Sequence, residues 1–371
     1  MLSDIHIAPL SETRQRIRDA YLLSDEEAVT RLLDELGIAP EVRERATARA
    51  TKLVAHIRSD DSHQNLMETF LGEYGLTNQE GIALMCLAEA LLRVPDNTTI
   101  DALIQDKIGT GDWKRHLGRS PSIFVNASTW GLMLAGAVVG TDDDQLEQRL
   151  LDVVRRLGEP LVREAVVQSI KFLGEHFVLG ASIDDALSRA ERYERQGYRF
   201  SYDMLGEAAK TAADAERYFM SYAGAITSIA KVCDPNGSAK TNPGISIKLS
   251  ALHPRYEYAN RERVLRELIP KVTSLASLAK AAKMGMNIDA EEADRLELSL
   301  DVFEALLDDV TLADWDGMGF VVQAYQKRAP YVLDWLIDKA KSRPQKLMIR
   351  LVKGAYWDSE IKHHQTLGVE G

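Results

Sequence analysis

The stretch LMIRLVKGAYWDSEIK, residues 347–362, decides the fold, because a short apolar segment runs through one arginine into an amphipathic helical pattern. Four earlier stretches follow the same order: 199–205 (RFSYDML), 245–249 (ISIKL), 286–289 (MNID) and 320–325 (FVVQAY). Helical patterns at residues 207–232, 261–283, 291–309 and 331–341 separate the stretches. Parallel strands require such segments, because each strand needs a crossover to return to the same end of a sheet. The order predicts an α/β barrel of the (βα)8 type with its chemistry at the strand ends.

Each predicted strand carries one polar side chain where a buried strand should be apolar. These residues are Asp203, Lys248, Asp289, Gln323 and Arg350. A buried charge without a partner is costly, so polar residues at corresponding positions indicate a shared polar site. Lys248 needs an anionic partner to keep its charge, and two partners are open at this point: a ligand, or a structural carboxylate such as Asp203 or Asp289.

The predicted barrel is incomplete. About five strands are present and about 190 residues follow Ser182, whereas a complete barrel of this kind takes about 250 residues. We therefore expect a C-terminally truncated piece of a longer enzyme. Ser182, with Asp185 three residues later, is expected to cap the helix before the first strand.

Helical periodicity dominates the chain before Ser182, so an all-α region is expected to precede the barrel. The expected domains are a helical arm at residues 1–57, an all-α domain at 58–180 and the partial barrel at 181–371. The first of these is polar on several faces, which is typical of a segment that lies across another subunit or domain.

Composition and charge are those of a globular protein. The 371 residues are 45% hydrophobic, and 45 basic against 56 acidic residues give a net charge of -11. No Lys/Arg cluster is present, which argues against nucleic acid as a main partner. Cys86 and Cys233 lie in apolar helical patterns and are expected to be reduced core thiols. The N-terminus lacks a signal peptide pattern, so a cytoplasmic protein is expected, with peripheral membrane contact left open.

No metal site is expected. His363 and His364 are neighbours that would point about 100° apart on a helix, so a solvated surface pair is the better interpretation. The acidic triplet at residues 142–144 lacks the spacing of a calcium loop and is expected to start a helix.

The predicted strands and the segments that follow them also resemble a known family. The strings are RFSYDMLGEAA (199–209), SIKLSALHPRY (246–256), NIDAEEADRLELSLD (287–301), GFVVQAYQKRAP (319–330) and IRLVKGAYWDSEIK (349–362). They are similar to the proline dehydrogenase domain of the bacterial bifunctional proline utilization A flavoenzymes, and SPSIFVNASTWGLMLAG (120–136) extends the resemblance towards the N-terminus.

The resemblance implies oxidation of L-proline to Δ1-pyrroline-5-carboxylate with FAD as the oxidant and a membrane quinone as the electron acceptor. In the family a second domain, absent from this chain, uses NAD to oxidise the hydrolysed product to glutamate. Dimerisation through the N-terminal arm is also implied. Some members begin with a DNA-binding domain; because this chain starts in the arm-like region, no repressor function is carried over.

The resemblance also implies roles for particular residues. Arg350 would contact the flavin near its N5, and Gln323 would offer both a donor and an acceptor to the ring edge. Four further cofactor residues are expected close to Arg350, namely Val352, Gly354, Ala355 and Trp357. No phosphate-binding GxGxxG motif occurs, so basic and amide groups on the barrel loops would hold the phosphates. A buried strand with an Arg that reaches solvent remains the structural alternative.

For the substrate, Lys248 is expected to meet the proline carboxylate, and Asp289 to organise the polar floor of the site. Leu351, Ala355 and Tyr356 would enclose the ring, although Tyr356 as a packing aromatic is an equal alternative. Glu207 corresponds to an acidic residue that gates the pocket by pairing with an arginine, which would lie beyond Gly371. We therefore expect the isolated chain to bind FAD weakly and to have little activity.

Two other functions remain open. One is a barrel enzyme that acts on a small carboxylate without a flavin. The other is a non-catalytic interaction module made of helices and a degenerate barrel.

Overall fold

The computed structural model describes residues 11–59 and 178–368. The chain forms two compact units, one from residues 1–37 together with 190–371 and the other from 38–189. The described part of the second unit includes the 20-residue helix α3 (Pro40–Ser59). The fold that positions the candidate site belongs to the first unit.

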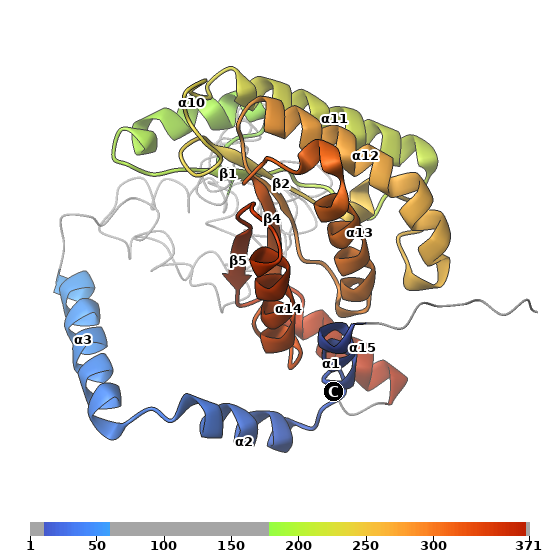
Figure 1. Cartoon of the computed structure of the whole chain (residues 1–371). Coiled ribbons are helices and arrows are strands. Elements are labelled where there is room, and N and C mark those ends of the chain that lie inside the picture. Colours follow the sequence, from blue (N-terminus) through green and yellow to red (C-terminus); the bar gives the residue numbers. More distant parts are fainter. Residues whose placement is uncertain (1–10, 60–177, 369–371) are drawn as a thin grey trace, which may run out of the picture. The chain divides into compact units, whose positions relative to one another are not determined.

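Five parallel strands form one sheet in chain order (Figure 1). They are β1 (Ser201–Asp203), β2 (Gly244–Ile247), β3 (Met286–Ile288), β4 (Met318–Gln323) and β5 (Met348–Val352). All five lie where the sequence predicted strands. Each new strand pairs with the one before it, which is the order of a (βα)8 barrel, and the fold prediction is confirmed as a curled partial barrel.

Helices follow the strands as crossovers. They are α11 (Ala212–Ala230), α12 (Arg261–Ala281), α13 (Leu296–Asp308), α14 (Ala329–Lys341) and α15 (Trp357–Leu367), with 3-10 turns at η3 (Leu249–Ala251), η4 (Tyr258–Asn260), η5 (Ala293–Arg295) and η6 (Val310–Leu312). Figure 1 shows α11, α12 and α13 packed side by side, in the order in which they occur in the chain. Helix α10 (Ile183–Glu194) precedes β1, and the Ser182 hydroxyl accepts a hydrogen bond from the Asp185 amide at 3.2 Å, as predicted.

The strands alternate between two environments because successive side chains point to opposite faces of a sheet. One face is apolar and fully buried, with Ile245 and Ile247 of β2, Ile288 of β3 and Phe320 of β4 at 0–1% exposure. Leu268 and Val272 of α12, Phe303 of α13 and Trp335 of α14 are buried to the same degree. This packing leaves the opposite, concave face of the sheet for the polar residues.

Two helices begin later than the sequence predicted. Helix α11 was expected from Glu207 but begins at Ala212, because Thr211 and Asp214 form a capping box in which each side chain accepts from the other's backbone amide. Helix α13 was expected from Glu291, but η5 intervenes and α13 starts at Leu296. Both shifts place acidic residues in loops at the carboxyl ends of strands.

The N-terminal helix α1 (Glu12–Asp19) packs on α14, and α2 (Asp25–Leu36) follows it. Arg14, which is 2% exposed, donates from Nη2 to Glu297 at 3.0 Å and to Asp301 at 2.9 Å, both on α13. Ile17 is fully buried beside it. The start of the expected arm is therefore built into the barrel unit.

Candidate active site at the carboxyl ends of the strands

The strand register brings the five predicted polar residues onto one face of the sheet. Asp203 pairs with Ser246, two residues before Lys248, and Ile247 pairs with Ile288, so Lys248 and Asp289 come next at the same level. Val321 pairs with Arg350, two residues before Gln323. Because side chains alternate along a strand, a step of two residues keeps the same face. The five residues therefore share the concave face, although Asp203 and Gln323 lie one layer away from the other three.

Lys248 is held between two carboxylates. Its Nζ lies 2.8 Å from Asp203 Oδ1 and 3.0 Å from Asp289 Oδ2, and its side chain is 12% exposed. Burial opposes the charge on Lys248, but the bonds and charges of Asp203 and Asp289 outweigh it and raise the pKa of the lysine. The Tyr222 hydroxyl also accepts a hydrogen bond from the Lys248 amide at 3.1 Å. Lys248 is thus a fixed cation, and the structural carboxylates left open by the sequence are its partners here.

Arg350 reaches across the concave face. Its Nη1 donates to the Ser246 hydroxyl at 2.9 Å and its Nη2 to the Ser201 hydroxyl at 2.7 Å. Ser201 belongs to β1 and Arg350 to β5, the two outer strands, so the sheet is strongly curled. Both partners are neutral hydroxyls. The guanidinium charge is therefore available to an anionic or electron-rich ligand on this face.

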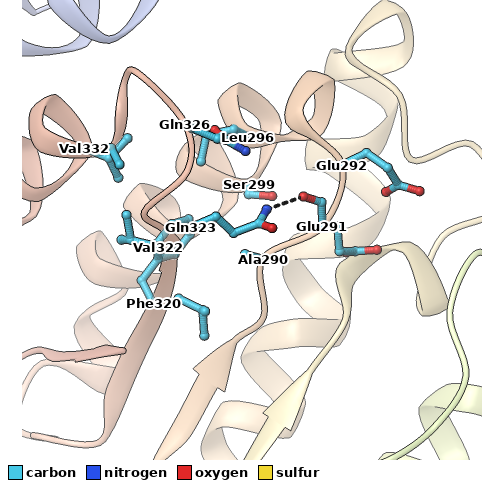
Figure 2. A pocket seen from close by; sticks show the side chains of 12 residues that line it. Ala290, Glu291, Glu292, Leu296, Ser299, Phe320, Val322, Gln323, Gln326 and Val332 are labelled. Atoms are coloured by element: carbon cyan, nitrogen blue, oxygen red, sulfur yellow. Dashed lines mark hydrogen bonds between the residues drawn. The ribbon is translucent and has the colours of Figure 1, made fainter. Parts of the chain in front are cut away.

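Gln323 ends β4 with its amide turned towards the loop after β3 (Figure 2). Its Nε2 donates to the Glu291 carbonyl oxygen at 2.8 Å, whereas its Oε1 is buried without a hydrogen-bond partner. The cavity in Figure 2, lined by Gln323, Glu291 and Ser299 among others, measures only about 20 Å³, which is room for about one water molecule. No flavin ring fits there, so a ring that meets Gln323 would lie on the concave side of the strand.

The loops after β1 and β5 meet through one hydrogen bond. The Tyr356 hydroxyl donates to Glu207 Oε2 at 3.1 Å. Burial raises the pKa of Tyr356, and the charge of Glu207 raises it further, so the phenol stays protonated as the donor. The two residues therefore link opposite sides of the sheet at its carboxyl end.

The other predicted cofactor residues, at the end of β5 and after it, lie in two places: on the concave face and beside a large cavity. Val352 pairs with Gln323 on the concave face. Gly354 and Trp357 line a cavity of about 870 Å³ together with Tyr325, Arg328 and residues of α15, a volume within the range of ligand pockets. Gly354 has φ +110, and a side chain there would collide with Tyr325 and come within 2.9 Å of Gln323 Oε1.

One predicted substrate residue lies on the other face. Leu351 alternates with Arg350 and Val352 and is 58% exposed. The structure therefore does not bring its side chain to the face of Lys248 and Arg350, because the strand period of two separates neighbours. Ala355 lies in the same loop as Tyr356, just before α15.

Sequence reasoning missed Glu291 and the serines of the concave face. Glu291 was assigned to a helix, although its side chain is only 1% exposed and it accepts from the Ser250 amide at 3.1 Å. The signal was available in part, because an acidic residue three positions after a buried strand falls at the end where barrel sites lie. Ser201 and Ser246 had no signal, since serine is ordinary on either face of a strand.

The remaining expectations concern metals and thiols. Within residues 11–59 and 178–368, no group of His, Cys, Asp and Glu is arranged to hold a metal ion. The His363 and His364 rings lie 6.3 Å apart, and His364 instead faces Tyr21. Cys233 is half-buried instead of belonging to the core, because it follows the end of α11; burial raises the pKa of its thiol. Cys86 and residues 142–144 lie outside the described residues. Among the helices within the described residues, none is both apolar enough and long enough to cross a membrane.

A curled sheet of five parallel strands, with the Lys248 ammonium and the Arg350 guanidinium near its carboxyl end, is the partial β/α barrel of an enzyme fold whose active sites lie at the strand ends. Three family models match the chain. "Proline dehydrogenase" matches residues 186–370, "DNA-binding domain of Proline dehydrogenase" matches 66–177, and "Proline utilization A proline dehydrogenase N-terminal domain" matches 11–58.

Full-length relatives agree with the family models. The chain is 50% identical over 369 residues to the bifunctional protein PutA of Salmonella typhimurium, covering 98% of this chain and 28% of that protein. It is 50% identical over 365 residues to PutA of Rhizobium meliloti, covering 98% and 29%. A crystal structure of a Bradyrhizobium japonicum PutA variant matches with a TM-score of 0.64 and 45% identity, over 95% of this chain and 35% of that one. This chain belongs to the proline utilization A family of proline dehydrogenases.

The matches bear on two other expectations. The chain spans only 28% and 29% of the length of these two PutA proteins, so the activities of the whole proteins are matters of proposal for it. The family model for residues 66–177 carries a DNA-binding description. Those residues lie outside the described part, and the expectation that no nucleic acid binds stays a prediction, as do the domain boundaries and the dimer.

Proposed function

We propose that this chain supplies the substrate- and flavin-binding face of a proline dehydrogenase that oxidises L-proline to Δ1-pyrroline-5-carboxylate. The observation that carries the proposal is the convergence of Lys248, Asp289 and Arg350 on one concave face at the carboxyl ends of the strands. The family membership of the chain supports the same reaction.

Proline is a zwitterion, and the Lys248 cluster offers both signs of charge. An ammonium group has three donors, and two of those on Lys248 go to Asp203 and Asp289. The third is left for the substrate carboxylate. The carboxylates beside it face the secondary amine of the ring, so that proline would be oriented at both of its charged groups.

The residues fit a flavin. Gln323 Oε1 is a buried acceptor without a partner, which a ring N–H would satisfy. Arg350 carries a positive charge bound only to hydroxyls, and cations near a flavin ring stabilise the charge that it gains on reduction. The flavin, when bound, would accept the hydride from the proline ring carbon beside nitrogen, and a quinone would reoxidise it.

Other residues position and enclose the site in this proposal. Val352, Gly354, Ala355 and Trp357 would shape the cofactor site, with Gly354 allowing close approach because no side chain fits there. Tyr356 and Glu207, joined by their hydrogen bond, would close the site over the substrate and exclude water. Leu351 remains a proposed substrate residue through its backbone only.

The test uses the longest natural polypeptide that contains these residues, purified with its cofactor. We expect visible flavin absorption and proline-dependent reduction of a quinone analogue. Arg350→Met is expected to lower flavin content, and Lys248→Met to raise the KM for proline while the flavin spectrum is kept. Proline oxidation without any flavin, or flavin without proline oxidation, would contradict the proposal and favour the flavin-free or the non-catalytic alternative respectively.

Activity of the chain by itself is a separate expectation. The described sheet has five strands. On one face of its last strand, β5, the apolar residues Ile349 and Leu351 are 40% and 58% exposed. We propose that residues 1–371 alone hold FAD weakly. Absorption of the purified chain after addition of FAD and gel filtration measures this directly.

A further inference from the structure

We infer that Glu291 and Ser250 are positioning residues, which fix the loop after β1 over the active site and thereby set the affinity for the substrate. The effect on substrate affinity rests on the proposed function. The effect on the position of the loop rests on hydrogen bonds alone. Among the hydrogen bonds and ion pairs of the described residues, none joins the side chain of either residue to Lys248, Asp203 or Asp289.

Glu291 is a buried carboxylate with defined partners. Its side chain is 1% exposed, Oε1 accepts from the Ser250 amide at 3.1 Å, and Oε2 lies 3.1 Å from Arg295 Nη1. Burial raises the pKa of Glu291, while Ser250 and Arg295 oppose that effect. A carboxylate buried this deeply is unfavourable unless bonds compensate it, so its position is strongly determined.

Ser250 transmits this position to the loop after β1. It is 1% exposed and lies two residues after Lys248. Its hydroxyl accepts from the Ala208 amide at 2.9 Å, and its carbonyl oxygen accepts from the Ala209 amide at 2.9 Å. Two consecutive amides of the loop are thus bound to one serine.

The loop needs this support because its backbone is strained. Ala208 has φ +52, a left-handed conformation that is unfavourable for an alanine. Such a conformation persists only where the surroundings determine it. The neighbouring residue is Glu207, whose carboxylate accepts from Tyr356 across the mouth of the site. By fixing the backbone at Ala208, the bonds from Ser250 therefore also fix the position of the neighbouring Glu207.

Glu291 is also bonded to Gln323, a residue of the proposed flavin site. The Glu291 carbonyl oxygen accepts from Gln323 Nε2 at 2.8 Å (Figure 2). Residues 291 and 250 thus connect the loops after β1, β2 and β3 with the end of β4. We expect loss of this connection to change substrate affinity more than the rate of the chemical step, because the groups on the concave face stay in place.

The experiment compares Ser250→Ala with Ser299→Ala in the full natural polypeptide with its cofactor. Ser299 is a matched control, since it is also a buried serine, 5% exposed, whose hydroxyl bonds to another side chain, the Tyr256 hydroxyl, at 2.7 Å. It has no bond to the loop after β1. Hydrogen exchange at the amides of residues 208 and 209 and steady-state kinetics with proline are measured for both variants.

For Ser250→Ala we expect faster exchange at the Ala208 amide, which loses its side-chain acceptor, and little change at the Ala209 amide, whose acceptor is the backbone carbonyl oxygen that alanine keeps. The KM for proline should rise roughly 3- to 10-fold, the effect of one lost hydrogen bond, with kcat within about twofold. Ser299→Ala should leave both readouts unchanged. Glu291→Gln, which keeps an acceptor for the Ser250 amide, should behave more like wild type than Glu291→Ala, and any failure of the latter to fold does not affect the serine comparison.

Unchanged exchange at the Ala208 amide in Ser250→Ala would overturn the inference, as would equal changes in the two serine variants or a fall in kcat at constant KM. If the protein does not oxidise proline at all, the proposed function fails, and the exchange measurement alone still decides whether Ser250 holds the loop.

Discussion

A single lysine decides the electrostatics of this site. Lys248 stands between Asp203 and Asp289, whose side chains are 44% and 18% exposed, so the cluster is intermediate between a surface and a buried ion pair. Replacing the cation leaves two carboxylates facing each other. The cost should therefore lie between the roughly 0–1 kcal/mol of exposed pairs and the roughly 3–5 kcal/mol of buried ones.

We predict that Lys248→Met lowers the free energy of unfolding by about 2 kcal/mol at neutral pH. The pKa of Lys248 is raised in the folded state, so its contribution is complete below the unfolded pKa of about 10 and decreases as the pH rises above it. Urea unfolding of wild type and variant at neutral pH and above pH 10 measures both effects. Lys271→Met, which removes a 3.7 Å pair with the exposed Glu216, should change little, and equal losses in the two variants would argue against a special cluster.

Gly354 is a second residue whose identity the geometry requires. Gly354→Ala should destabilise the protein by about 2–4 kcal/mol, because left-handed strain is added to a collision with Tyr325. Gly197→Ala is the matched control: its φ is +94, and nothing lies within 4 Å of an added side chain. It should show the strain alone, about 1–2 kcal/mol. Thermal unfolding separates the two, and a loss at Gly354 no greater than at Gly197 would disprove the collision.

At the scale of elements, helix α1 is attached to the barrel by a buried guanidinium. Arg14 contacts Glu297 and Asp301, whose side chains are 13% and 9% exposed, and it lies over the Trp335 ring at 5.5 Å. Arg16, two residues further along, is 49% exposed and pairs with Asp334 at 3.5 Å. The two arginines therefore offer the same charge on one helix in opposite environments.

We predict that Arg14→Ala costs about 3–5 kcal/mol, since two largely buried carboxylates lose a partner, whereas Arg16→Ala costs at most about 1 kcal/mol. Hydrogen exchange should show the loss in α1 and in the facing part of α13. Comparable losses for the two variants would mean that α1 is not anchored through Arg14.

At the scale of the whole molecule, the first compact unit is assembled from two separate segments, residues 1–37 and 190–371. A protease site inserted between residues 37 and 38 would cut the covalent link but leave the contacts of α1. We predict that the piece 1–37 stays bound after cleavage and co-elutes in gel filtration. In Arg14→Ala it should be released, and in Arg16→Ala retained; release from the wild type would contradict the assignment of α1 to this unit.

The sequence by itself determined the strands, their parallel order and the five polar residues of the site. Alternating apolar residues and the crossover lengths are local signals, and burial of charge is unfavourable wherever the strand lies. The shared face of the candidate site residues Lys248, Asp289 and Arg350 was therefore predictable without coordinates, whereas their roles stay predictions. The face of Leu351 also follows from the strand period of two, which places its side chain opposite that of Arg350.

Only the tertiary structure decided which groups these residues bind. The partners of Arg350 lie more than a hundred positions away in the chain, and the role of Glu291 depends on a 3-10 turn that displaced the start of a helix. Such contacts arise from the curl of the sheet and the packing of its loops, which bring together residues with no local signal of their own. Sequence pattern encodes the strands and their faces, whereas the distances across the site depend on the curl of the whole sheet.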